Sequence, residues 1–145
     1  MFNKLKSSLN PTHTPIINPA FGLFGIAGFL GFIGLVPFAY GEEIVTYPTF
    51  FFMFAFFGYF NLYYKGKMSG TLIDERFRHN ASRASLLAYK IAFGFVIGVN
   101  ALIIASFQFL TSHAALGILI AAIGFSLCFA VFFEQYLLYK YENEE

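Results

Sequence analysis

The densest group of reactive side chains lies in one short segment, Asp74 to His79, which reads DERFRH. Its carboxylates, guanidinium groups and imidazole could bind a partner. We expect a partner-binding surface made of Asp74, Glu75, Arg76, Phe77, Arg78 and His79. The alternative is a solvated helix start, in which the carboxylates favour the positive end of the helix dipole and the cations contact anionic lipid.

Three further polar residues border or interrupt long apolar runs: Lys90, Asn100 and Glu134. Lys90 and Glu134 are expected at similar depth and could form an ion pair, although separate snorkelling toward water is the more frequent outcome near helix ends. Asn100 lies deeper, where one interhelical hydrogen bond is the expected use and a polar pathway is the alternative.

The residues that carry enzyme and metal chemistry do not converge in this sequence. It contains no nucleophile elbow, P-loop or zinc-ligand spacing. His13, His79 and His113 fall in three separate segments, and the single cysteine, Cys128, has no intramolecular disulfide partner. We therefore expect no enzyme activity, no cofactor and no metal site. The net charge of +1 predicts no direct binding to nucleic acid.

The elements that must position these residues are long and apolar. Of the 145 residues, 58% are hydrophobic and only 12% are charged, a composition typical of a membrane protein. A transmembrane helix needs about 20 apolar residues, and every backbone polar group in lipid must be paired internally. The sequence predicts an all-α integral membrane bundle of four transmembrane helices, at 20–40, 44–64, 91–110 and 114–138. The remaining segments are a tail at 1–19, a loop with a helical extension at 65–90 and a second tail at 139–145.

The distribution of cations predicts how the chain is oriented. All nine Lys and Arg residues fall on one side of the four spans, whereas the connections at 41–43 and 111–113 carry none. The positive-inside rule then places both termini and the central loop in the cytoplasm, for a multi-pass protein of the cell membrane. A secretory signal peptide is a weaker reading of the first span, because its apolar run is longer than a signal core.

Glycine recurs at every third position of the first span: Gly22, Gly25, Gly28, Gly31 and Gly34. On an α-helix this spacing sweeps about 240° around the axis, so we expect a winding groove into which the Phe-rich second span packs. The third and fourth spans each carry small residues on one face, and we expect these two faces to pack together. They comprise Gly94, Gly98, Ala101, Ala105 and Gln108 on the third span, and Ala114, Gly117, Ala121, Gly124 and Cys128 on the fourth.

Capping signals predict where three of the helices begin. Asn18 followed by Pro19 suits the start of the first helix, and Pro48 suits the first turn of the second. The three prolines within residues 1–19 disfavour regular structure there. Thr71 and Asp74 are spaced like a capping box, so we expect the third helix to begin near Leu72, well before the membrane.

Three segments together resemble a known family. The run GIAGFLGFIGL, the Phe-rich FFFMFAFFGYF and the loop DERFRHNASRASLLAYKIAF are similar to small bacterial multi-pass membrane proteins grouped as a domain of unknown function. Those proteins share an LGFLGFLGL-like run, a Phe-rich span and a DER loop, and the resemblance covers about residues 20–110. Genes of this kind often lie beside a small helix-turn-helix regulator. The resemblance therefore implies, by association, a membrane partner that holds or releases a transcription factor.

The function predicted from these features is a non-enzymatic membrane protein whose cytoplasmic loop binds a soluble partner, such as a small helix-turn-helix transcriptional regulator. The alternative is a small transporter, channel or peptide-immunity protein acting within the bilayer, suggested by Lys90, Asn100 and Glu134. Substrate pathways usually show more ionisable groups inside the membrane. A homo-oligomer is also an open reading, since a winding glycine groove would leave surface for a second copy.

Overall fold

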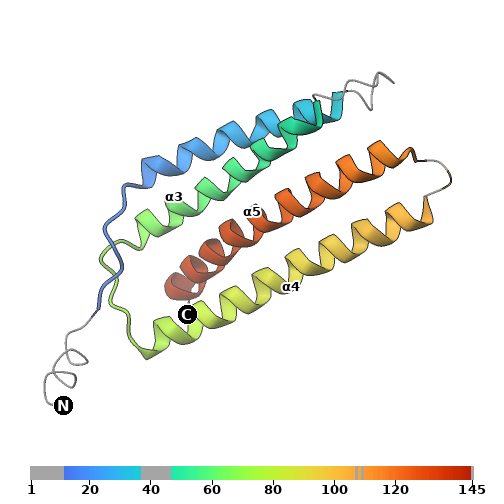
Figure 1. The fold of residues 1–145 in the computed structure, drawn as a ribbon. Coiled ribbons are helices and arrows are strands. Elements are labelled where there is room, and N and C mark those ends of the chain that lie inside the picture. The colour runs from blue at the N-terminus through green and yellow to red at the C-terminus, as the bar shows by residue number, and fades with distance from the viewer. Residues whose placement is uncertain (1–11, 37–46, 107, 109, 145) are drawn as a thin grey trace, which may run out of the picture.

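The fold consists of two helical hairpins side by side, in a computed structural model that describes residues 12–36, 47–106, 108 and 110–144. The first hairpin contains η1 (Pro19–Leu35), η2 (Tyr47–Tyr59) and α3 (Phe60–Lys67), which continues directly from η2. The second contains α4 (Glu75–Ala105) and α5 (Ser112–Glu144). Figure 1 shows α5 between the first hairpin and α4, so the helices form an open row. The regular elements of the described residues are all helices, and α4 and α5 are apolar and long enough to cross a membrane.

Both rods of the first hairpin are largely 3₁₀-helical, with 17 residues in η1 and 13 in η2. Such lengths are unusual, because 3₁₀ runs beyond three or four residues are uncommon. With 3.0 residues per turn, positions three apart lie directly above one another. The five glycines of η1 therefore form one straight face. The predicted winding groove is wrong, because the prediction assumed the 3.6 residues per turn of an α-helix.

An aromatic residue of η2 or α3 faces four of the five glycines of that stripe. The pairs are Gly22 with Tyr63, Gly25 with Phe60, Gly28 with Phe57 and Gly31 with Phe54. Each three-residue step along η1 is thus matched by a three-residue step back along η2 and α3. If both elements were α-helices, residues three positions farther along would be rotated by about 60° around each helix axis, and successive pairs would no longer face each other. In a 3₁₀-helix they stay aligned, so the shared period of three favours 3₁₀ geometry. Close packing of glycine against a Phe-rich partner, as predicted, holds this hairpin together.

The second hairpin packs through residues other than those predicted. The buried face of α4 consists of Phe77, Asn80, Ala84, Ala88 and Ala92. Gly94 and Gly98 are exposed, and a Cβ atom on either would meet nothing within 4 Å. The prediction that their face packs against the fourth span is therefore wrong. Gly94 lies about 100° around the helix axis from Phe77, so it falls outside the face on which Phe77 is buried.

The small residues of α5 contact the first hairpin. A Cβ atom on Gly124 would lie 3.9 Å from the carbonyl oxygen of Phe51, and a Cβ atom on Gly58 would lie 4.0 Å from Sγ of Cys128. Gly117 is buried and Ala121 is half-buried on the same helix. This face was predicted to meet the third span, whereas Gly124 and Cys128 lie against η2. α5 therefore packs against the first hairpin as well as against α4.

The helix ends follow the capping signals in part. Asn18 caps η1, with its Oδ1 accepting from the N–H of Ala20 at 2.9 Å, and Pro19 is the first helical residue as predicted. α4 begins at Glu75, three residues later than expected, because Asp74 itself is the cap and accepts from the N–H of Phe77 at 2.7 Å. α4 ends at Ala105, whereas α5 continues through Glu144, beyond the span end predicted at 138. The connection at 41–43 and residues 1–11 lie outside the described residues.

Charged side chains of both hairpins gather at one end of the row. We call this the basic end and define it by residues 12–18, 65–90 and 134–144. Every Lys, Arg, Asp and Glu among the described residues lies there, including the seven cations. In Figure 1 it is the end at which α4 begins and α5 ends. The opposite end, where α4 turns into α5, carries no charged residue in the described part of the chain.

Candidate partner surface at the basic end

A compact apolar core underlies the basic end. Its buried members are Met68, Phe77, Ala84, Leu137 and Leu138, surrounded by Ile73, Ala81, Phe133, Tyr139 and Tyr141. These residues come from the link between the hairpins, from the start of α4 and from the last turns of α5. Burial of this kind contributes about 1.5–3 kcal/mol for each large side chain. The core therefore holds the first turns of α4 in a fixed position.

Residues 12–18, which we call the N-terminal strap, run along the link between the hairpins. The N–H of Thr14 donates to the carbonyl of Thr71 at 2.9 Å, and the N–H of Ile73 donates to the carbonyl of Thr12 at 2.8 Å. Ser69 Oγ accepts from the N–H of Ile17 at 2.9 Å. The sequence suggested an irregular tail here. Its prolines do prevent a helix, but the extended backbone is paired by hydrogen bonds.

Of the six residues predicted to bind a partner, five are exposed and one is buried. Glu75, Arg76, Arg78 and His79 are exposed on the first two turns of α4, and Asp74 is exposed at its cap. Phe77 instead lies in the core and is only 9% exposed. Phe77 therefore cannot serve as a contact residue, because helical periodicity turns it toward Met68 and α5. It fixes the helix from which its neighbours project.

Two cations of the basic end lie over tyrosine rings. Nζ of Lys67 is 4.7 Å from the ring centroid of Tyr63 and 5.5 Å from that of Tyr139. The hydrogen bond with Tyr63, reinforced by the electrostatic attraction of Tyr63 and Tyr139, raises the pKa of Lys67 above its usual value. The guanidinium of Arg83 lies 4.6 Å from the ring centroid of Tyr141. Sequence reasoning missed these contacts, of which Lys67 with Tyr139 and Arg83 with Tyr141 join α3 and α4 to α5.

A buried amide adds a second link between α4 and α5. Asn80 is 3% exposed, and its Nδ2 donates to Oε1 of Glu142 at 2.8 Å. Sequence reasoning did not find this pair, because it ended the fourth span at 138 and left Glu142 in a tail. The charged end of α5 is therefore held against the start of α4 by a hydrogen bond.

The three polar residues at the apolar boundary do not form a shared site. Lys90 is exposed, and neither it nor Glu134 makes an ion pair with any residue that the structure describes. The hypothesis of a Lys90–Glu134 pair is therefore not supported. Nδ2 of Asn100 donates to the carbonyl of Val96 at 3.0 Å, within its own helix. The expected interhelical bond of Asn100 is therefore absent from the described structure.

Metal-binding geometry is not found in the described part of the chain, where no three His, Cys, Asp or Glu side chains come close enough to hold an ion. No protein-family model, curated protein or solved structure matches the chain. The resemblance to small bacterial membrane proteins with a DER loop therefore stays a prediction. What the basic end offers is a set of exposed charged side chains mounted on a rigid core.

Proposed function

We propose that this chain is a non-enzymatic multi-pass protein of the cell membrane that crosses the bilayer four times and binds a soluble partner through the start of α4. The first support is the amount of apolar side chain at the surface. Phe93 is 69% exposed, Leu102 68% and Ile104 75%, all on α4. Exposed apolar surface this extensive favours a hydrocarbon environment over water.

The 3₁₀ geometry supports two of the four spans. A 3₁₀-helix rises about 2.0 Å per residue, so the 17 residues of η1 extend about 34 Å. The same residues as an α-helix would extend only about 26 Å, less than the roughly 30 Å of a hydrocarbon core. η2 and α3 together have 13 and 8 residues, which gives roughly 38 Å. Each rod of the first hairpin is thus long enough to span.

Orientation in this proposal follows from the basic end, which carries every Lys and Arg of the described residues and which the positive-inside rule places in the cytoplasm. The test is cysteine labelling in intact cells, on a Cys128→Ala background. We expect Ser112→Cys, at the uncharged end, to react with an impermeant maleimide from outside. Ser69→Cys should react only after the cells are permeabilised. Labelling of both positions from outside, or a chain that stays monodisperse without detergent, would contradict four spans.

The exposed polar side chains of Glu75, Arg76, Arg78 and His79 are the observation that carries partner binding. The cap at Asp74 and the buried Phe77 hold these side chains in a fixed pattern, which lowers the entropic cost of recognition. A small helix-turn-helix regulator is the partner class that the family resemblance implies. Transport has less support, because Asn100 is satisfied by its own helix and the described charges all lie at the basic end.

Site-specific photo-crosslinking tests the partner surface in the full-length protein. A photoreactive phenylalanine analogue at Arg78 should give a discrete protein adduct in cells. The same analogue at Leu102, on the lipid-facing part of α4, should give none. Arg76→Ala introduced together with the probe should weaken the adduct. Equal crosslinking at both positions, or no protein adduct at Arg78, would contradict a docking surface at the start of α4.

A further inference from the structure

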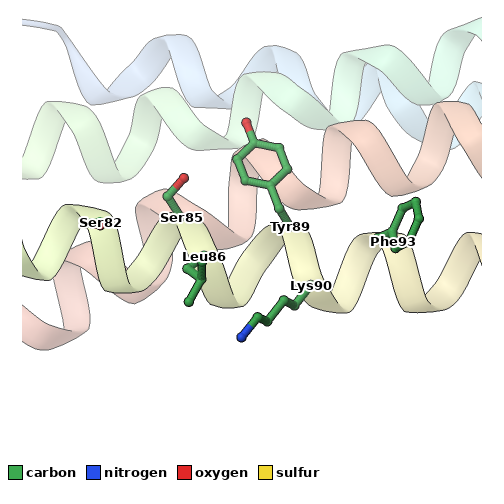
Figure 2. Close-up of a pocket in the computed structure, with 6 residues that line it drawn as sticks. All are labelled: Ser82, Ser85, Leu86, Tyr89, Lys90 and Phe93. Atoms are coloured by element: carbon green, nitrogen blue, oxygen red, sulfur yellow. The ribbon is translucent and has the colours of Figure 1, made fainter.

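A shallow hollow lies on the outer face of α4, where its charged part meets its apolar part. Six side chains border about 480 Å³: Ser82, Ser85, Leu86, Tyr89, Lys90 and Phe93. In Figure 2, Ser85 and Tyr89 point to one flank of α4 and Leu86 and Lys90 to the other, with Phe93 one turn farther along. The hollow thus has hydroxyl groups on one flank, a cation on the opposite flank and an aromatic ring at its far end.

The ammonium group of Lys90 has no anionic partner among the residues that the structure describes. The only carboxylate within α4 itself is that of Glu75, fifteen residues and about 22 Å away along the helix. Lys90 therefore presents a positive charge to its surroundings that no acidic residue nearby on the same helix compensates.

Along α4, hydroxyl groups, a cation and an apolar ring follow one another in the same order as the headgroup, the phosphate and the acyl chains of a phospholipid. Lys90 is the last charged residue before a stretch without charge that runs to the end of the helix at Ala105. In the four-span arrangement proposed above, on which this inference rests, Lys90 lies at the level of the lipid phosphates. Hydroxyl groups lie on its aqueous side, and the exposed ring of Phe93 lies at the level of the acyl chains.

We infer that this hollow binds one anionic phospholipid whose headgroup carries hydroxyl groups, of the phosphatidylglycerol class. The phosphodiester lies against Nζ of Lys90, which neutralises its charge. The headgroup hydroxyls extend across the face of α4 toward Ser85 and Tyr89, and an acyl chain lies over Phe93. A zwitterionic lipid such as phosphatidylcholine lacks both the net charge and the hydroxyl groups that these side chains recognise.

Native mass spectrometry of the full chain in non-ionic detergent tests this site with dioleoyl phosphatidylglycerol and dioleoyl phosphatidylcholine. We expect the first bound phosphatidylglycerol to bind at least fivefold more tightly. Lys90→Gln should remove about a fivefold factor for phosphatidylglycerol and leave phosphatidylcholine unchanged, and Lys90→Arg should retain the preference. Lys140→Gln is the matched control, because it removes the same charge at the same end from a residue paired with Glu144 at 3.5 Å. That control should change affinity less than twofold.

Three results would overturn the inference. The first is equal affinity for the two lipids, and the second is an equal loss in Lys90→Gln and Lys140→Gln, which would indicate attraction to net charge alone. The third is displacement of the lipid by millimolar glycerol phosphate, which would indicate a site for a soluble phosphate. Circular dichroism melting curves of each variant separate loss of binding from loss of fold. A cysteine-labelling pattern other than the expected one would contradict the four-span proposal itself. The expected labelling pattern together with no preference between the two lipids would contradict only this lipid site.

Discussion

The contact between Gly28 and Phe57 allows the packing of the first hairpin to be tested with a single methyl group. In Gly28→Ala the new Cβ atom would lie 2.6 Å from Cδ1 and 2.7 Å from Cγ of Phe57. Non-bonded carbon atoms prefer about 3.5–4.0 Å, so the ring or the backbone must move by about 1 Å. The ring has little room, because Phe29 packs edge-on at 5.1 Å and Phe54 stacks at 5.9 Å between centroids.

The expected cost follows from overpacking in a close-packed interior, about 1–3 kcal/mol in the free energy of unfolding. Gly98→Ala provides the matched control, because the same methyl group at that position meets nothing within 4 Å. Gly98 lies within an α-helix, where alanine is favoured over glycine by up to about 1 kcal/mol. The two substitutions should therefore change stability in opposite directions.

Equilibrium unfolding by sodium dodecyl sulfate in mixed micelles, followed by circular dichroism, measures both effects. Phe57→Ala in the Gly28→Ala background completes a double-mutant cycle. Removal of the ring makes space for the new methyl, so the double variant should lose less stability than the sum of the two single variants. Wild-type stability in Gly28→Ala, an equal loss in Gly98→Ala, or strict additivity in the cycle would refute the packing argument.

Three further substitutions address the basic end. Asp74→Ala should cost about 1 kcal/mol by removing the helix cap and should speed hydrogen exchange at the N–H of Phe77, whereas Asp74→Ser should retain most of the protection. Asn80→Ala should cost about 1–2 kcal/mol in unfolding free energy, because it removes the bond to Glu142; an unchanged stability would show that this bond contributes nothing. Tyr63→Phe should return the pKa of Lys67 toward its usual value, measured by NMR titration of the lysine side chain. In the wild-type protein that pKa is raised, so the contact of the charged amine is complete at neutral pH and is lost only as pH rises through the raised pKa.

The long apolar segments could be predicted from the sequence, because length and hydrophobicity are local properties. The turn geometry of the first hairpin could not. The period of three in the glycines was visible, and so was the same period in Phe51, Phe54, Phe57 and Phe60. Only the matching of the two patterns across a hairpin makes 3₁₀ geometry favourable, and this is a tertiary property. Intrinsic propensity, which argues against long 3₁₀ runs, was outweighed by packing.

In α4, the spacing of small residues does not identify the face that packs against α5. Gly94 and Gly98 have the spacing of a helix-packing motif, yet both are exposed, and the buried face of α4 consists of Phe77, Asn80, Ala84, Ala88 and Ala92, nearer the start of the helix. The exposure of the charged residues at the start of α4 is easier to predict, because charged side chains at a helix start are exposed by default. Phe77 was the exception, since its burial depends on Leu137 and Leu138, about sixty residues later in the chain.

The N-terminal strap has a consequence for biosynthesis. Thr12 and Thr14 bond with residues 70–73, so the chain must be made to that point before its beginning can settle. A ribosome adding about 5–20 residues per second reaches this stage within seconds. Until then the first apolar segment is held only by its own hairpin. Truncating the N-terminus should therefore leave insertion intact but slow the maturation of the completed structure, a delay that pulse-labelling with timed proteolysis can follow.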